Sequence, residues 1–327
     1  MTLSRRKARE LLASRGLHPR RALGQHFVVD PNTVRRVARL AGVGSGDRVV
    51  EVGAGLGALT LALAETGASV TAVEVDRGLL PVLREVVEPA GVRVVEGDAL
   101  RLEWDAVLGG GGGPPWALVA NLPYNVATPL IADLLDGVPA IGRMLVMVQR
   151  EVAERLAAGP GDEGYGAVSV KVAYWATARV AGRVPPSVFL PPPKVESALV
   201  DIRRRPAPAV ADVDPRWLFT LVGTGFAQRR KMLRGSLGRL VGPDEFACAG
   251  VAPQARPEDL DVAAWGRLAA CTTPPPSCPS PCGSPASGPT ATTSSTPRWS
   301  PSTTATASSS GRATGWRSPV LGRGGYR

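Results

Sequence analysis

The sequence is poor in cysteine and has no long apolar run. Four cysteines occur in 327 residues; Cys248 stands alone in the body, and Cys271, Cys278 and Cys282 lie near the C-terminus. We therefore expect no disulfide framework. No stretch of about 18 apolar residues is present, and the first residues lack the apolar segment of a secretory signal. These absences predict a soluble cytoplasmic protein without membrane attachment.

Acidic residues are scarce toward the C-terminus. The chain has 38 Lys and Arg against 28 Asp and Glu, a net charge of +10, and a pI near 10.2. This balance favours a polyanionic partner. Residues 271–327 carry five arginines and no acid, so half of the excess lies there. The rest of the chain is only mildly basic.

Residues 271–327 also have almost no aliphatic side chains. They consist mainly of Pro, Ser, Thr, Ala, Gly and Arg, and such a composition buries too little surface to offset its ordering entropy. We expect this tail to be disordered. It is either a genuine extension or an out-of-frame reading of GC-rich coding DNA, which yields the same residue types.

Residues 1–204 alternate between strand and helix patterns. A basic helix is expected at 5–15 and another after the cap at Asp30. Strands are expected at 47–52, 69–75, 92–96, 117–120, 143–149 and 197–203, with helices at 58–65, 77–87, 129–135 and 150–157. This alternation predicts an α/β domain with a mainly parallel sheet covered by helices on both faces. Ligands of such sheets bind at the carboxyl ends of the strands.

Residues 205–270 carry helical periodicity after a proline-rich linker. Helices are expected at 217–226, 229–240, 243–249 and 257–268, each separated from the next by Gly or Pro. The sequence therefore predicts a catalytic domain at 1–204, a small helical domain at 205–270 and the tail.

Several candidate ligand-binding residues follow the strands. Gly53-x-Gly55-x-Gly57 lets the backbone turn tightly and approach a ligand, although NAD, FAD and S-adenosylmethionine sites all use such a turn. Glu74 ends the next strand, where an acid can accept both ribose hydroxyls of a cofactor. Asp98, after the third strand, suits an adenine amino group, or is only a helix cap.

Asn121-Leu122-Pro123-Tyr124 follows the fourth strand and is the most informative motif. The exocyclic amine of adenine is a poor nucleophile because its lone pair is delocalised into the ring. The Asn121 oxygen and the carbonyl of Leu122 or Pro123 can accept its two N–H groups, while Tyr124 stacks on the base.

Together with Leu23-Gly24-Gln25-His26-Phe27, Phe189-x-Pro191-x-Pro193-x-Val195-x-Ser197 and Phe226-x-x-Arg229-Arg230-Lys231-x-Leu233-Arg234, these motifs resemble those of the ribosomal RNA adenine dimethyltransferases over about residues 18–269. Within that family they are most similar to the enzymes that form N6,N6-dimethyladenosine at two adjacent adenosines near the 3′ end of 16S rRNA. The resemblance implies a Rossmann-like methyltransferase domain.

The resemblance also implies roles for particular residues. S-adenosylmethionine would contact His26, Val28, Gly53, Gly55, Glu74, Asp98 and Asn121. The residues Asn121, Leu122, Pro123 and Tyr124 would hold the target base, with Phe189 stacking on its other face. His26 departs from the commoner Asn. Arg229, Arg230, Lys231 and Arg234 would bind rRNA phosphates, while Arg5, Arg6, Lys7, Arg9 and Arg15 are either RNA contacts or a solvated face.

The expected protein is thus a monomeric methyltransferase without a metal, acting on 16S rRNA in the 30S subunit and contributing to small-subunit biogenesis. Two rivals share its catalytic motifs: a macrolide-resistance type methyltransferase acting on large-subunit rRNA, and an assembly factor whose main role is to occupy the immature subunit. A nicotinamide oxidoreductase would share the glycine turn and Glu74 but would not use Asn121–Tyr124.

Overall fold

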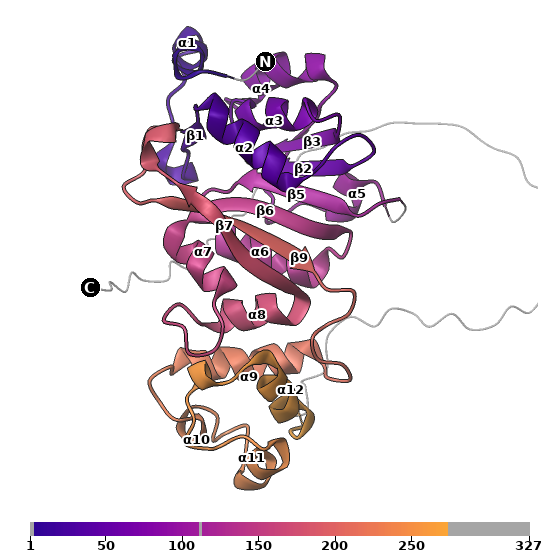
Figure 1. Ribbon diagram of the computed structural model, residues 1–327, viewed down its shortest axis with the longest axis vertical. Coiled ribbons are helices and arrows are strands. Elements are labelled where there is room, and N and C mark those ends of the chain that lie inside the picture. The colour runs from indigo at the N-terminus through magenta and orange to yellow at the C-terminus, as the bar shows by residue number, and fades with distance from the viewer. Residues whose placement is uncertain (1–2, 111–112, 274–327) are drawn as a thin grey trace, which may run out of the picture. The chain divides into compact units, whose positions relative to one another are not determined.

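The computed structural model describes residues 3–110 and 113–273. Its main sheet has the strand order β4-β3-β2-β5-β6-β9-β7 (Figure 1). Strands β2 to β6 run parallel, and β9 is antiparallel to both β6 and β7. The strands are β1 (Phe27–Val28), β2 (Arg48–Val52), β3 (Ser69–Glu74), β4 (Arg93–Glu96), β5 (Trp116–Asn121), β6 (Ile141–Gln149), β7 (Ala176–Val184), β8 (Phe189–Leu190) and β9 (Ser197–Arg204). The predicted α/β class with a mainly parallel sheet is confirmed.

Helices cover both faces of this sheet. They are α1 (Arg5–Ser14), α2 (Pro31–Ala41), α3 (Ala58–Ala64), α4 (Leu80–Val87), α5 (Trp104–Leu108), α6 (Ala127–Gly137), α7 (Arg150–Ala157) and α8 (Ala167–Trp175). Further helices follow β9 in the chain: α9 (Pro215–Ala227), α10 (Leu233–Ser236), α11 (Pro243–Ala249) and α12 (Val262–Ala270). Short 3₁₀ turns are η1 (Arg21–Leu23), η2 (Glu88–Ala90), η3 (Pro186–Val188) and η4 (Pro257–Asp259). None of the helices in the described ranges is long and apolar enough to cross a membrane.

Alternation along the strands produces two cores, one on each face of the sheet. Val49 of β2 packs with α1 to α4, whereas its neighbour Val50 packs with α5 to α8. Because successive side chains of a strand point to opposite faces, a strand buried on both sides is apolar at nearly every position. This explains why β2, β5 and β6 were predictable from apolar runs.

Strand β7 was not predicted. It lies at the edge of the sheet and pairs only with β9, so many of its side chains are exposed. Arg179, Gly182 and Arg183 interrupt its apolar pattern, and a half-solvated edge strand does not need that pattern.

Helices α9 to α12 surround a third core. Its members include Trp217, Leu221 and Trp265, and it also takes in Tyr165 and Tyr174 from the segment around α8. All described residues belong to one compact unit, and α8 packs against both the sheet and α9. The division into a catalytic and an RNA-binding domain at 204/205 stays a functional prediction.

The prediction of a helix at 229–240 was wrong. Only α10 (Leu233–Ser236) is helical there, because the backbone N–H groups of Leu233 and Arg234 donate to Ala255 and Pro253 carbonyls instead of to the preceding turn. The basic residues 229–231 therefore lie on a turn rather than on one helix face.

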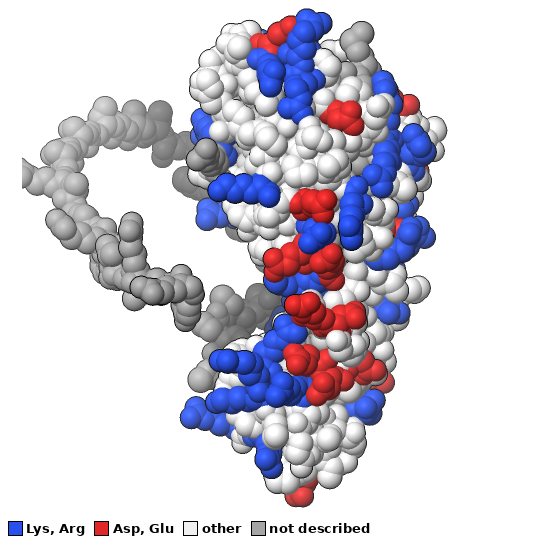
Figure 2. Space-filling model, turned by 60° about the vertical axis from the view of Figure 1, so that its left-hand side comes forward, with Lys and Arg blue, Asp and Glu red and all other residues white. Residues whose placement is uncertain are grey.

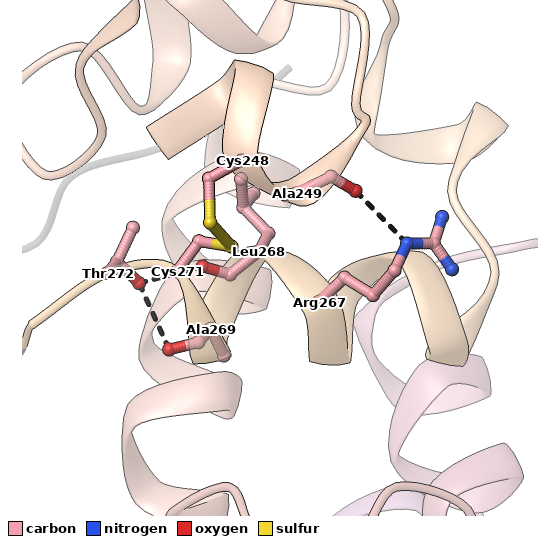
Figure 3. The surroundings of a disulfide bond; sticks show 7 residues. All are labelled: Cys248, Ala249, Arg267, Leu268, Ala269, Cys271 and Thr272. Carbon is pink, nitrogen blue, oxygen red and sulfur yellow. Dashed lines mark hydrogen bonds between the residues drawn. A yellow bond between two sulfur atoms is a disulfide. The ribbon is translucent and has the colours of Figure 1, made fainter. Parts of the chain in front are cut away.

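The sequence predicted no disulfide framework, but one pair of cysteines is bonded. Cys248 and Cys271 form a disulfide that joins the end of α11 to the end of α12 (Figure 3). Beyond it, the Thr272 hydroxyl accepts a hydrogen bond from Trp217 Nε1 at 2.8 Å and donates one to Leu268. Residues 271 and 272 thus complete the helical core, and the expected tail begins later than 271. Residues 274–327, on which the disorder prediction falls, lie outside the described residues.

Candidate active site

A pocket lies at the carboxyl ends of β2, β3 and β5, as the strand order predicts. Its empty space is about 710 Å³, part of it open to solvent. The predicted residues that line it are Gly53, Gly55, Glu74, His26, Val28 and the tetrapeptide Asn121–Tyr124. Residues from four separate stretches of the chain therefore meet at one edge of the sheet.

The glycine turn leads from β2 into α3. Gly53, Gly55 and Gly57 all have positive φ, with values of 73°, 59° and 82°, which favour glycine. At Gly55 space imposes a second requirement, because an added Cβ would lie 2.9 Å from the Phe27 ring. The backbone here thus forms a close-fitting wall.

Glu74 at the end of β3 holds this turn in place. Its Oε2 accepts a hydrogen bond from Gly55 N at 2.7 Å, and its Oε1 accepts from the backbone N–H groups of Val75 and Asp76. The side chain is buried. Burial raises the Glu74 pKa, and these backbone hydrogen bonds oppose the shift. The carboxyl is therefore a structural anchor as well as the predicted ribose acceptor.

Asp76 ties the segment before β1 to the pocket. Its Oδ2 accepts from Gln25 Nε2 at 2.8 Å, and the Arg20 guanidinium lies 3.2 Å from Oδ1. Leu23, Gly24 and Gln25 consequently line one side of the pocket. No role for Asp76 or Gln25 was predicted, since their pairing depends on tertiary contact across about fifty residues.

Glu51 is the acid that sequence reasoning left without a role. It lies within β2, is buried and lines the pocket. Its Oε2 has no hydrogen-bond partner among the described residues. Burial raises the Glu51 pKa from 4.5 to about 8; the neighbouring Thr60 hydroxyl offsets this only in part, and the Glu74 charge adds to it. An acid among the buried valines of β2 was the sequence feature that could have indicated it.

We expect Glu51→Gln to stabilise the protein at alkaline pH. Between pH 4.5 and about 8 the folded protein holds a proton that the unfolded chain has lost, so wild-type stability falls by about 1.4 kcal/mol per pH unit as pH rises through this window. The neutral, isosteric glutamine removes that slope. Thermal unfolding of both proteins from about pH 5 to pH 9 measures the difference; a constant gap between the two curves would contradict the assignment.

Asn121 and its neighbours form the opposite wall. Asn121 Nδ2 donates to the His26 carbonyl at 2.9 Å, which fixes the amide so that Oδ1 stays available as an acceptor. The Pro123 carbonyl already accepts the Val126 and Ala127 N–H groups at the start of α6. The Leu122 carbonyl accepts no hydrogen bond from the described residues, which makes it the available one of the two carbonyls considered from the sequence.

The Tyr124 ring stacks on His26. The centroids are 5.5 Å apart and the planes differ by 27°, while the Tyr124 hydroxyl bonds Ser197 Oγ at 2.7 Å. The His26 ring is held by a hydrogen bond between Nδ1 and the Pro191 carbonyl. The imidazole at this position therefore contacts Tyr124 directly, which the sequence did not indicate.

The expected position of Phe189 beside the target base is not observed. Phe189 pairs with Val28 across the short β1–β8 ladder, is fully buried and does not line the pocket. Its side chain packs in the core below α1, where Arg5 holds the Phe189 carbonyl. Val28 does line the pocket, as predicted.

Asp98 lies in an adjoining pocket that shares Gly53, Val75 and Pro123 with the first. Its Oδ1 accepts from Leu100 N at 3.1 Å, so it caps the following turn. The turn-capping alternative is thus present, and the carboxylate also faces the second pocket.

The predicted RNA-binding residues differ in their contacts. Arg229 pairs with Glu258 at 2.6 Å and donates to the Glu163 carbonyl, so it braces the turn. Arg230, Lys231 and Arg234 are exposed and form no ion pair with the described residues. In Figure 2, Lys and Arg side chains gather toward the two ends of the visible face, with acidic side chains between them.

The pocket fits the proposed cofactor. S-adenosylmethionine has an adenosine, an ammonium and a sulfonium group, and the pocket offers a close backbone wall at Gly53–Gly55, the Glu74 carboxyl and a buried Glu51 oxygen without a partner among the described residues. A buried carboxyl without a partner suits a cationic group. Within the described residues, no group of three His, Cys, Asp or Glu side chains forms a metal site.

The chain is similar to several known proteins. Residues 16–273 match the family model described as "Ribosomal RNA adenine dimethylase". The protein named "Ribosomal RNA small subunit methyltransferase A" of Magnetococcus marinus is 46% identical over 273 residues, which cover 82% of this chain and 96% of that protein. The protein of the same name from Kineococcus radiotolerans is 48% identical over 278 residues, covering 82% and 91%. The crystal structure of the 23S rRNA methyltransferase ErmE is 27% identical with a TM-score of 0.58, covering 75% of this chain and 98% of that one.

Proposed function

The chain belongs to the ribosomal RNA adenine dimethylase family, and we propose that it dimethylates N6 of two adjacent adenosines near the 3′ end of 16S rRNA in the 30S subunit. It is an S-adenosylmethionine-dependent methyltransferase. It would act as a cytoplasmic monomer and contribute to small-subunit biogenesis. The observation that supports the proposal most directly is the available Asn121 Oδ1 beside the free Leu122 carbonyl, at the edge of the pocket.

Two groups of residues would serve the reaction. Glu74, Gly53, Gly55 and Asp98 would hold the adenosine part of the cofactor, and Glu51 its cationic part. When bound, S-adenosylmethionine supplies a methyl group made electrophilic by its sulfonium. Asn121 Oδ1 and the Leu122 carbonyl would accept the two N–H bonds of the target amine. Localising the nitrogen lone pair in this way favours attack, and the amine proton then leaves to solvent.

Tyr124 would supply a stacking surface for the target base. Its hydroxyl is fixed by Ser197, so the ring orientation is set before substrate arrives. Stacking of a base on an aromatic ring contributes about 1–3 kcal/mol. The resemblance also implied stacking by Phe189 on the other face of the base; that side chain is fully buried and does not line the pocket.

The choice of small over large subunit rests on the relatives. Two proteins named as small-subunit methyltransferases are 46% and 48% identical to this chain, whereas the 23S rRNA enzyme is 27% identical. The exposed side chains of Arg230 and Lys231 on the turn and of Arg234 in α10 would supply cations for rRNA phosphates.

The decisive experiment is transfer of labelled methyl from S-adenosylmethionine to 30S particles that lack the adenine methylation. We expect label on 16S rRNA, recovered as dimethyladenosine, and none on 50S particles. Label on 50S would replace the proposal with large-subunit methylation. Tight 30S binding without any label would favour a role as an assembly factor.

A further inference from the structure

A second basic surface lies outside the pocket, where α2 lies beside β6 and β7. It is formed by Arg36 and Arg39 of α2, Arg143 of β6, Arg179 of β7 and Arg203 of β9. None of these residues lines the pocket, and none belongs to the predicted RNA-binding cluster on the turn at 229–234.

Three of these arginines share one buried acid. Asp201 accepts from Arg143 Nε at 3.0 Å, from Arg179 Nη2 at 2.9 Å and from Arg203 Nε at 3.3 Å. The strand register explains the cluster, since Arg143 lies opposite Arg203 and Arg179 opposite Asp201. Side chains at these paired positions project from the same face of the sheet.

The shared acid leaves an excess of positive charge. Burial by itself would raise the Asp201 pKa, but hydrogen bonds and charge from Arg143, Arg179 and Arg203 hold that pKa below its ordinary value. Asp201 is therefore ionised and neutralises only one of three guanidinium groups. The pairing also orients the arginines, so less side-chain entropy is lost when they bind an anion.

The outer arginines keep unused donors in solvent. The side chains of Arg179 and Arg203 are 67% and 59% exposed, and each contributes one N–H group to Asp201, which leaves the rest of the planar fork free. Arg143, by contrast, is mostly buried and also binds the Ala41 and Leu40 carbonyls at the end of α2.

Helix α2 extends the surface. Arg36 lies over β7, where its Nη1 donates to the Arg183 carbonyl at 3.1 Å. Arg39 is one turn further along the same side of the helix; it is exposed and forms no ion pair with the described residues. Basic groups thus continue from the middle of α2 to the Asp201 cluster.

We propose that Arg39, Arg179 and Arg203 form a second rRNA-binding surface that contacts phosphates of the substrate particle outside the target adenosines. The inference rests on the proposed function. Planar, exposed and preoriented guanidinium groups match phosphate oxygens, and a large ribonucleoprotein substrate can reach this surface while a base occupies the pocket. The surface adds affinity and orientation without taking part in the chemistry.

The test measures binding to unmethylated 30S particles over a salt series from about 0.05 to 0.2 M. We expect Arg179→Gln/Arg203→Gln to bind about ten-fold more weakly and to lower the slope of log K against log salt by about 1.5, since each lost phosphate contact accounts for about 0.7–0.9. Affinity for S-adenosylhomocysteine and kcat at saturating particles should stay unchanged. Arg179→Lys/Arg203→Lys, which keeps the charge, should retain the wild-type slope.

Two further variants guard against misfolding and general charge effects. Arg39→Gln leaves the Asp201 cluster intact and should lower the slope by about 0.8. Arg84→Gln removes an exposed arginine of α4 that pairs with Glu88 and should change nothing. An unchanged slope in both glutamine variants of the surface would overturn the proposal.

Edge arginines can also protect a strand from pairing with another copy. Self-association of the variants with unchanged 30S affinity would therefore replace the proposal with that role. Failure of the wild-type protein to bind or methylate 30S particles would instead refute the proposed function, so the two failures are distinguishable.

Discussion

Asn121→Ala is expected to lower kcat for methyl transfer by about 10²–10³-fold, the cost typical of removing one well-placed polar group from a transition state. The substitution removes Oδ1, the proposed acceptor for the target amine, and the Nδ2 donor that the His26 carbonyl holds. Affinity for the 30S particle should change little, because phosphate contacts dominate it. Single-turnover transfer and particle binding, measured separately, check both parts.

Two variants sharpen this result. Asn121→Asp keeps the shape but places a carboxylate oxygen against the His26 carbonyl, so it should be as inactive as alanine. Asn32→Ala removes an exposed amide of α2 that lies outside both pockets and should keep near wild-type transfer. Substantial activity in Asn121→Ala, with kcat within about three-fold of wild type, would remove Asn121 from the catalytic machinery, because loss of such a group costs far more.

Glu74→Gln is expected to weaken S-adenosylhomocysteine binding by about ten- to hundred-fold. Three of the roughly four acceptor positions of the carboxylate are taken by backbone N–H groups, which leaves Oε2 for one charge-assisted hydrogen bond to a ribose hydroxyl, worth about 1.5–3 kcal/mol. The glutamine amide also meets backbone N–H groups that now donate to carboxylate oxygens, those of Gly55, Val75 and Asp76. The glycine turn should therefore loosen as well. Calorimetric titration and thermal unfolding report the two effects.

Glu96 provides the matched control. It lies opposite Glu74 in the β3–β4 ladder and pairs at the surface with Arg77. Glu96→Gln should bind S-adenosylhomocysteine like the wild type. Equal losses in both variants would mean that Glu74 is an ordinary strand-end acid rather than a specific ligand-binding group.

Much of the fold was predictable because buried parallel strands carry an unmistakable pattern. Val49 packs on one face of the sheet, and Val50 and Val52 pack on the other, so β2 is apolar on both faces. The glycine turn follows directly after Val52. Edge strand β7 lacks that pattern. Arg179 is exposed to solvent, and Gly182 lies at a bulge where the pairing with β9 shifts register. The length of α10 was overestimated. The carbonyls that accept its first N–H groups belong to Pro253 and Ala255, and the local sequence pattern around 229–240 does not reveal these contacts.

The pocket was predictable for a related reason. Side chains that follow parallel strands must converge, so Glu74 and Asn121 could be placed together from their strand positions alone. The burial of Phe189 could not be foreseen, because it depends on the β1–β8 ladder, in which Phe189 pairs with Val28, 161 residues earlier in the chain. The contact of His26 with Tyr124 has the same origin.

Helix α8 packs into two cores at once, and this has a consequence for which adenosines could react. Val172 packs into the sheet core, and Val170 and Tyr174 pack into the helical core, so a single helix links the sheet, whose strand ends form the pocket, to the helical segment that carries Arg230 and Lys231. If that turn binds RNA phosphates, α8 limits how far from those phosphates a base can lie and still enter the pocket. The two adjacent adenosines of the proposed substrate would both lie within that reach, whereas more distant adenosines of the rRNA would not.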